Sequence, residues 1–129
     1  MSLLYTISEL AKEFDITTRT IRFYEAEGLL NPQREGQNRI YSERDRVHLM
    51  LILRGKRLGF SLAESKELIE MYDPAGANRK QLNRYMEMIR ERRLSLNQQI
   101  QDIQSMLTEL IGAEHKCREA LDAQADIVE

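Results

Sequence analysis

The sequence is poor in the residues that build disulfides, metal cages and membrane-spanning helices. Among its 129 residues there is one cysteine, Cys117, so a single copy can form no internal disulfide and no cage of several thiolates. No apolar run approaches the roughly 20 residues that a membrane helix needs, and residues 1–10 lack the layout of a signal peptide. We therefore expect a soluble cytoplasmic protein that contacts no membrane.

The sequence also offers little catalytic chemistry. Its two histidines, His48 and His115, and its single cysteine give no set of nucleophile, base and orienting group. It contains no glycine-rich loop of the kind that cradles a phosphate. We expect no enzyme activity and no bound cofactor.

Charge is balanced over the whole chain but not along it. Lys and Arg number 19 and Asp and Glu number 21, which gives a net charge of -2. Residues 17–57 hold nine basic and five acidic side chains, whereas residues 61–129 hold nine basic and thirteen acidic ones. A localised basic region on an acidic protein can steer a polyanion toward one surface. The first half is therefore the candidate for binding nucleic acid.

Two short helices joined by a tight turn are predicted near the N-terminus. A capping box starts at Thr6, and apolar residues then recur at helical intervals. Residues 15–18 interrupt this pattern with side chains that can cap a second helix, which runs to a stop at Gly28. Such a pair can lay its second helix in the major groove of DNA. The residues expected there, near the start of the second helix, are Thr18, Arg19 and Arg22.

A small β-hairpin, or wing, is predicted after the second helix. Residues 33–38 are polar and include Gly36, and residues 39–41 alternate between polar and apolar. An arginine guanidinium can donate two parallel hydrogen bonds to phosphate oxygens, and a tyrosine hydroxyl can donate one more. We expect the wing to hold the DNA backbone through Arg34, Arg39 and Tyr41.

A second pair of helices is predicted after the wing. Residues 42–45 open a third helix that ends at Gly55 or Leu58, and a capping box at residues 61–64 opens a fourth. Arg54 lies near the turn between them, together with Lys56 and Arg57. The residues expected to pack in the core are Ile7, Ile21, Leu29, Phe60 and Leu62.

A long amphipathic helix is predicted in the second half. Twelve positions from 82 to 121 alternate in steps of three and four, which is the seam of a coiled coil, and ten of them are apolar. One helix cannot bury such a stripe alone, so we expect a homodimer. The expected dimerisation residues are Leu82, Met86, Ile89, Arg93, Leu96, Ile100, Ile103, Leu107, Leu110 and Glu114, and the seam continues to Cys117 and Leu121.

The two polar seam positions favour an antiparallel pairing. Arg93 and Glu114 lie nearly symmetrically about Ile103 and Gln104. An antiparallel dimer centred there would place Arg93 of one copy opposite Glu114 of the other, whereas a parallel dimer would stack like charges.

These spaced motifs resemble those of the MerR family of bacterial transcription regulators. The residues that carry the resemblance are Thr20–Glu25, Gly28–Leu29, Arg39–Tyr41 and Leu58–Leu62. The resemblance implies that the dimer bends and undertwists promoter DNA so that RNA polymerase can engage it, under the control of a small effector at the dimer interface. It also implies that the residues that face DNA are Arg19, Arg22, Tyr24, Arg39, Tyr41 and Arg54.

The expected architecture is mainly α, a winged helix-turn-helix followed by a long antiparallel coiled-coil helix. We expect the DNA-binding domain at residues 1–72, a linker or hinge at 73–78, the dimerisation helix at 79–121 and a short tail at 122–129. The basic stretch at 52–61 and the short tail are most similar to regulators of leucine, isovalerate and acyl-CoA breakdown. Without a separate domain for an effector, control could also be set by abundance of the protein.

Some alternatives stay open at this stage. Many MerR relatives sense metals with several cysteines after the dimer helix, but here Cys117 has no second cysteine and His115 lies on another helix face. A structural Cys117 on the seam is favoured over a metal ligand or redox sensor, and a packed or surface His48 over a switch. The chain could instead be a coiled-coil module that binds protein, which salt-sensitive DNA binding would exclude.

Overall fold

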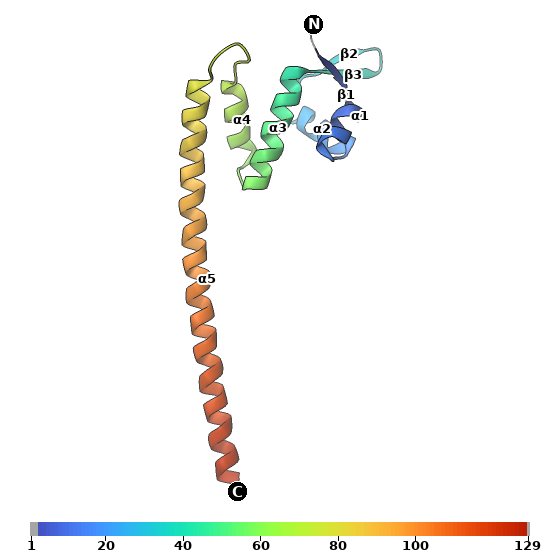
Figure 1. Cartoon of the computed structure of the whole chain (residues 1–129). Helices are drawn as coiled ribbons and strands as arrows, with labels where there is room; N and C mark the ends of the chain where they lie inside the picture. The colour runs from blue at the N-terminus through green and yellow to red at the C-terminus, as the bar shows by residue number, and fades with distance from the viewer. Residues whose placement is uncertain (1–2, 129) are drawn as a thin grey trace. The chain divides into compact units, whose positions relative to one another are not determined.

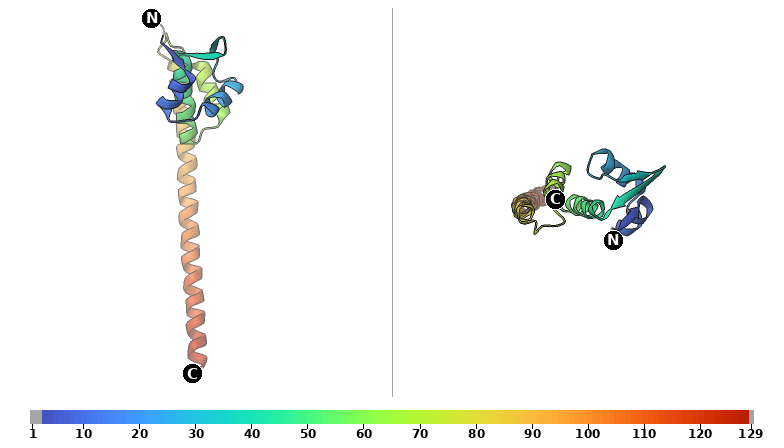
Figure 2. Two further views of the ribbon diagram at one scale, coloured as in Figure 1. Left: turned by 90° about the vertical axis from the view of Figure 1, so that its right-hand side faces the viewer. Right: turned by 90° about the horizontal axis from the view of Figure 1, so that it is seen from above.

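The computed structural model describes residues 3–128, which form five helices and one small sheet (Figure 1). The chain divides into two compact units, of which the first ends at Glu87 and the second begins at Met88. In the first unit, α3 lies between α4 and the pair of α1 and α2 (Figure 1 and Figure 2). The elements are β1 (Leu4–Thr6), α1 (Ile7–Phe14), α2 (Thr18–Ala26), β2 (Gln33–Glu35), β3 (Asn38–Ser42), α3 (Glu43–Leu58), α4 (Leu62–Met71) and α5 (Arg79–Val128).

The helices start where the sequence predicted. Thr6 caps α1 in a capping box, and equivalent boxes begin at Ser42 for α3 and at Ser61 for α4. The side chain of Thr17 caps α2 by accepting a 3.2 Å hydrogen bond from the backbone N–H of Thr20. These caps fix the tight turn between α1 and α2, so the predicted helix-turn-helix is confirmed.

The predicted wing is the hairpin of β2 and β3. Gly36 turns it with a φ of 63°, a left-handed conformation that glycine adopts without strain. A third strand, β1, pairs antiparallel with the other side of β3 and places Tyr5 opposite Tyr41. The sequence did not predict β1, because three residues are too few to show a periodic pattern.

The hydrophobic core of the first unit lies between α1, α2, β3, α3 and α4. Ile21, Leu29 and Phe60 are buried as expected, and Ile7 and Leu62 pack partly buried against the core. The buried core cluster consists of Leu10, Ile21, Tyr24, Leu29, Leu30, Tyr41, Leu49, Ile52 and Ile69.

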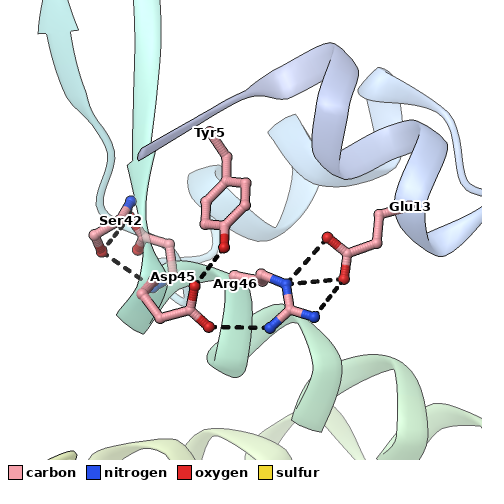
Figure 3. A network of polar contacts seen from close by, with 6 residues as sticks. Tyr5, Glu13, Ser42, Asp45 and Arg46 are labelled. Atoms are coloured by element: carbon pink, nitrogen blue, oxygen red, sulfur yellow. Dashed lines mark hydrogen bonds and ion pairs between the residues drawn. The ribbon is translucent and has the colours of Figure 1, made fainter. Parts of the chain in front are cut away.

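A network of polar contacts fastens the N-terminal elements to α3 (Figure 3). Arg46 of α3 reaches Glu13 of α1 at 2.6 Å and Glu43 at 3.0 Å, and the hydroxyl of Tyr5 donates to Glu43. Asp45 accepts hydrogen bonds from the backbone N–H groups of Asn31 and Ser42 at 3.1 Å. The two carboxylates beside Arg46 raise its pKa, so it stays a structural cation.

The third helix passes through Gly55 and ends at Leu58, the second of the two predicted ends. Gly59 follows with a φ of 85°, which satisfies the last carbonyls of α3. Gly55 lies where α4 approaches most closely, since a Cβ atom at this position would stand 2.6 Å from Oγ of Ser65. Gly55 is therefore a packing residue within the helix.

The expected hinge at residues 73–78 lies inside the first unit instead of at its edge. The first turns of α5 are bonded to α4, because Gln81 donates a 2.9 Å hydrogen bond to the carbonyl of Leu68 and Arg84 pairs with Glu67 at 2.7 Å. The loop itself is held by Asn78, whose side chain accepts from the N–H of Asp73 at 2.7 Å and donates to its carbonyl at 2.9 Å. The boundary between the two units therefore falls within α5.

The long helix α5 carries the predicted seam and extends beyond its expected end. It continues to Val128, through residues that the sequence analysis assigned to a tail, because no proline or glycine follows Gly112. Most of the seam is exposed in the single chain, and Ile103 at its middle is 52% exposed. Within the described part of the chain, none of the helices could cross a membrane.

Candidate nucleic-acid interface

The second helix of the helix-turn-helix divides its residues between a buried and an exposed face. Ile21 and Tyr24 point into the core, while Arg19, Arg22 and Phe23 lie on the opposite face and are exposed. Half of the surface of Phe23 is exposed. Thr18, the first residue of α2, is half-buried. The arginines predicted to read DNA therefore lie together on an accessible helix face.

The two tyrosines expected on DNA are core residues instead. Tyr24 packs beside Ile21 one turn away, and Tyr41 occupies an inward position on β3 with none of its surface exposed. The hydroxyl of Tyr41 faces Glu25 at 3.5 Å, and burial and this carboxylate raise the pKa of Tyr41 to about 12. Both tyrosines therefore lie in the core behind the exposed arginines.

One carboxylate, that of Glu25, joins the wing to the second helix. Nε of Arg39 donates to Glu25 at 2.7 Å, and the more exposed Arg34 lies 3.6 Å from the other carboxylate oxygen. Arg34 and Arg39 are cross-strand neighbours on the wing, so one acidic side chain orients both. The sequence pattern did not reveal this role, although an acidic residue inside a basic window was a signal for it.

A hollow of about 540 Å³ separates the start of α1 from the wing. Arg22 of α2 borders it from one side, and the wing borders it from the other. Guanidinium groups and neutral hydrogen-bond donors thus face a common space, which suits contact with a phosphodiester backbone. The residues that line it are Thr6, Ile7, Ser8, Arg22, Glu35, Gln37, Asn38, Arg39 and Ile40.

A second group of basic side chains lies where α3 turns into α4. Arg54, Lys56 and Arg57 are exposed there. Lys56 and Phe23 line the same smaller hollow of about 210 Å³ above Phe60. The exposed face of α2 therefore adjoins the basic end of α3, and the two form one surface.

Neither histidine nor the cysteine builds a metal site in the described part of the chain, where no cluster of three ligand-type side chains occurs. Cys117 is exposed in the single chain, and His115 pairs with Glu119 at 3.1 Å. His48 is buried against Tyr72, and its Nε2 atom meets no hydrogen-bond partner among the described residues. Burial, followed by the nearby Arg44, lowers the pKa of His48.

Comparison with known proteins agrees with this architecture. The sequence matches the MerR HTH family of regulatory proteins over residues 5–72 and the family described as "MerR, DNA binding" over residues 46–113. It is 32% identical to the HTH-type transcriptional regulator CueR of Escherichia coli O6:H1, covering 95% of this chain and 90% of the relative. A probable heavy metal-dependent transcriptional regulator of Haemophilus influenzae is also 32% identical, with 87% of each chain covered.

Solved structures show the same fold. A MerR family regulator from Bacillus cereus is 32% identical, with a TM-score of 0.61 over 83% of this chain and 79% of the other. HiNmlR, a MerR family regulator lacking the sensor domain and bound to promoter DNA, is 27% identical, with a TM-score of 0.56 over 81% and 79%. Together with the exposed arginine face, these matches define a DNA-binding transcription regulator. The chain belongs to the MerR family.

Proposed function

We propose that the protein binds an inverted-repeat operator as a homodimer. The observation that carries this proposal is the exposed apolar seam of α5, which a second copy would cover, together with one arginine-bearing helix face in each chain. A twofold dimer presents two identical reading faces, so its binding site is an inverted repeat whose half-sites match the spacing of those faces.

Within each half-site, the exposed arginines take different roles. Arg19 and Arg22, with Thr18 beside them, contact bases or phosphates in the major groove, because they lie near the start of α2 on its accessible face. Arg34 and Arg54 hold the backbone on either side. Arg39 acts mainly by fixing the wing, since its Nε is already bonded to Glu25.

The proposed regulation is by deformation of promoter DNA. A MerR dimer that bends and undertwists its promoter brings both promoter elements within reach of RNA polymerase. The energy needed to deform the DNA depends on the sequence of base pairs that the protein does not contact. Support comes from membership of the family and from the likeness to HiNmlR, whose structure is described as bound to promoter DNA. A small effector at the dimer interface would shift the angle between the two reading faces.

For the effector, we propose an acyl-CoA or a related acid of leucine or isovalerate breakdown. The proposal follows from the resemblance stated in the sequence analysis for the stretch at residues 52–61, which holds the basic side chains Arg54, Lys56 and Arg57. Operator affinity measured with and without isovaleryl-CoA tests this choice. A change of at least about threefold is expected, and equal affinities would contradict it.

Metal or redox sensing through Cys117 is the second candidate, favoured by the likeness to a heavy metal-dependent regulator. Cys117 lies on the seam, where a homodimer would bury it as an unreactive residue. Reaction of the dimer with a thiol reagent separates the two cases. Slow labelling that becomes fast only on unfolding supports the structural role, and rapid labelling of the native dimer supports the sensor.

Selection of bound duplexes from a random DNA pool, followed by a salt series, tests the main proposal. The expected result is an inverted repeat whose affinity falls steeply as salt rises, because the exposed arginines release counterions from phosphates. Enrichment of no sequence, or an affinity independent of salt, would contradict DNA reading and favour a protein-binding module.

Replacing one arginine on the reading face tests its role. Arg22→Ala is expected to leave the dimer intact and to weaken operator binding by about 10-fold to 100-fold. Lys116→Ala is the matched control, because it removes an exposed cation from the outer face of α5, away from the predicted seam. Equal affinity of both variants for the selected duplex would show that Arg22 does not contact DNA.

A further inference from the structure

The smaller hollow of the basic surface lies between α2, α3 and the start of α4. It has a volume of about 210 Å³, and Phe23 of the exposed α2 face forms part of its wall. This volume is below the roughly 300 Å³ at which sites for drug-sized ligands begin, so only a small molecule fits. All of the residues that line it belong to the first unit, so one chain contains the whole hollow.

Most of the wall is apolar. Ile52 of α3, Phe60 of the following turn and Leu62 of α4 line the hollow together with the ring of Phe23. Ile52 and Phe60 are buried, so the packing of the core holds them in place. A hydrocarbon chain that covers this wall leaves water, which is favourable in proportion to the apolar area removed.

Two buried hydroxyl residues, Ser65 and Tyr24, also line the hollow. Each is 4% exposed. The backbone N–H of Ser65 is bonded to the carbonyl of Ser61 at 3.0 Å, but neither hydroxyl has a hydrogen-bond partner among the described residues. A buried hydroxyl without a partner costs free energy, and a bound acceptor recovers it.

The charge at the hollow is positive. Lys56 lines it and is exposed, and none of the described residues in its wall is acidic. A bound carboxylate would meet an ammonium group and hydroxyl donors, whereas a cationic ligand would meet the like charge of Lys56. The donors and the apolar wall together therefore suit a small molecule with a hydrocarbon chain and one carboxylate.

We propose that this hollow binds a small aliphatic carboxylate and that the bound anion competes with DNA. The carboxylate pairs with Lys56 and accepts a hydrogen bond from Ser65, and its hydrocarbon chain covers Ile52 and Phe60. The site is separate from the dimer interface, because a single chain contains it. Competition follows because Lys56 and Phe23 belong to the surface proposed to face DNA, and this part of the inference rests on the proposed function.

Titration of the purified protein with isovalerate, followed by calorimetry, tests the site. Isovaleramide is the matched control ligand, because it has nearly the same shape and no charge. We expect a dissociation constant of about 1 mM for isovalerate, which is within reach of so small a ligand, and at least about 10-fold weaker binding of the amide. Equal affinities for the two ligands, or no saturation by isovalerate at about 20 mM, would overturn the site.

Variants of the lining residues locate the ligand. Lys56→Gln should weaken isovalerate binding at least about 10-fold, and Ser65→Ala should weaken it about threefold, since each removes a donor to the carboxylate. Lys66→Gln is the matched control, because it removes an exposed cation from α4 outside the hollow. Equal weakening by Lys56→Gln and Lys66→Gln would show a general effect of charge and overturn the assignment.

The effect on DNA is measured with the selected duplex at constant ionic strength. Isovalerate at about ten times its dissociation constant should lower operator affinity about 10-fold, because the ligand and DNA exclude each other, and isovaleramide should leave it unchanged. Equal operator affinity in the two solutions would overturn the competition. A protein that binds isovalerate but selects no duplex would instead contradict the proposed DNA reading and support the site.

Discussion

A single acidic side chain, Glu25, sets the position of two cations in the basic surface. Its carboxylate lies 2.7 Å from Nε of Arg39 and 3.6 Å from Arg34, so the wing is tied to the helix that carries Arg22. A partly buried ion pair of this kind adds little net stability but fixes geometry. The residue thus links the wing to α2, the two parts of the interface that we propose to contact DNA.

Removing the charge of Glu25 should cost specificity more than affinity. In Glu25→Gln, the wing loses its anchor while the surface becomes more positive, so binding to random DNA is maintained or strengthened. We expect the ratio of operator to random-duplex affinity to fall about 10-fold, measured at one salt concentration. Glu35→Gln, at the exposed edge of the wing, is the control. A similar ratio in both variants would show that Glu25 does not position the wing.

The buried His48 predicts a loss of stability in mild acid. Its pKa is lowered in the folded protein by burial, so the unfolded chain binds the proton at higher pH than the folded one. The stability contribution is complete above about pH 6.5 and declines as the pH falls below it. The interval from about pH 7 to about pH 5.5 spans the ordinary pKa of histidine, about 6.5. Over this interval, the melting temperature of His48→Leu should therefore fall less than that of the unmutated protein. An equal fall in melting temperature for the variant and the unmutated protein would contradict the prediction.

At the scale of elements, the approach of α3 to α4 depends on Gly55. A methyl group there meets Oγ of the buried Ser65 at 2.6 Å, so Gly55→Ala gains helix propensity but strains this contact. Removing the hydroxyl in Gly55→Ala/Ser65→Ala relieves the strain. We expect the double variant to exceed the single Gly55→Ala by about 1 kcal/mol in unfolding free energy, measured with denaturant. If the change in unfolding free energy of the double variant equals the sum of the changes in Gly55→Ala and Ser65→Ala, the two positions do not contact.

The elements that local chemistry specifies were predictable from the sequence, and those that depend on distant packing were not. Capping boxes at Thr6, Ser42 and Ser61 mark helix starts, and a three-four repeat marks α5. Burial of Tyr24 and Tyr41 follows from which face of each element meets the core, so the family motif that contains them did not reveal it. The loop at residues 73–78 has the composition of a hinge, but contacts from Gln81 and Arg84 to α4 hold it within the first unit.

At the scale of the whole molecule, the exposed seam predicts that dimerisation and DNA binding are linked. Ile103→Glu puts an unpaired charge at the middle of the seam, so the dimer should dissociate and operator affinity should fall at least about 100-fold. Ser105→Glu adds the same charge to the outer face of the helix and should leave both unchanged. Gel filtration and binding curves on the same samples make the comparison. Full operator affinity in a monomeric Ile103→Glu would separate the two functions.

The most direct test of the account compares a duplex that carries both selected half-sites with one in which a single half-site is scrambled. Binding curves give the affinities, and sedimentation gives the number of chains on each duplex. We predict two chains on the intact duplex and an affinity at least about 100-fold weaker for the scrambled one, because half of the base contacts are lost. One chain per duplex, with equal affinity for both, would contradict the proposal that this MerR family protein reads DNA as a symmetric dimer.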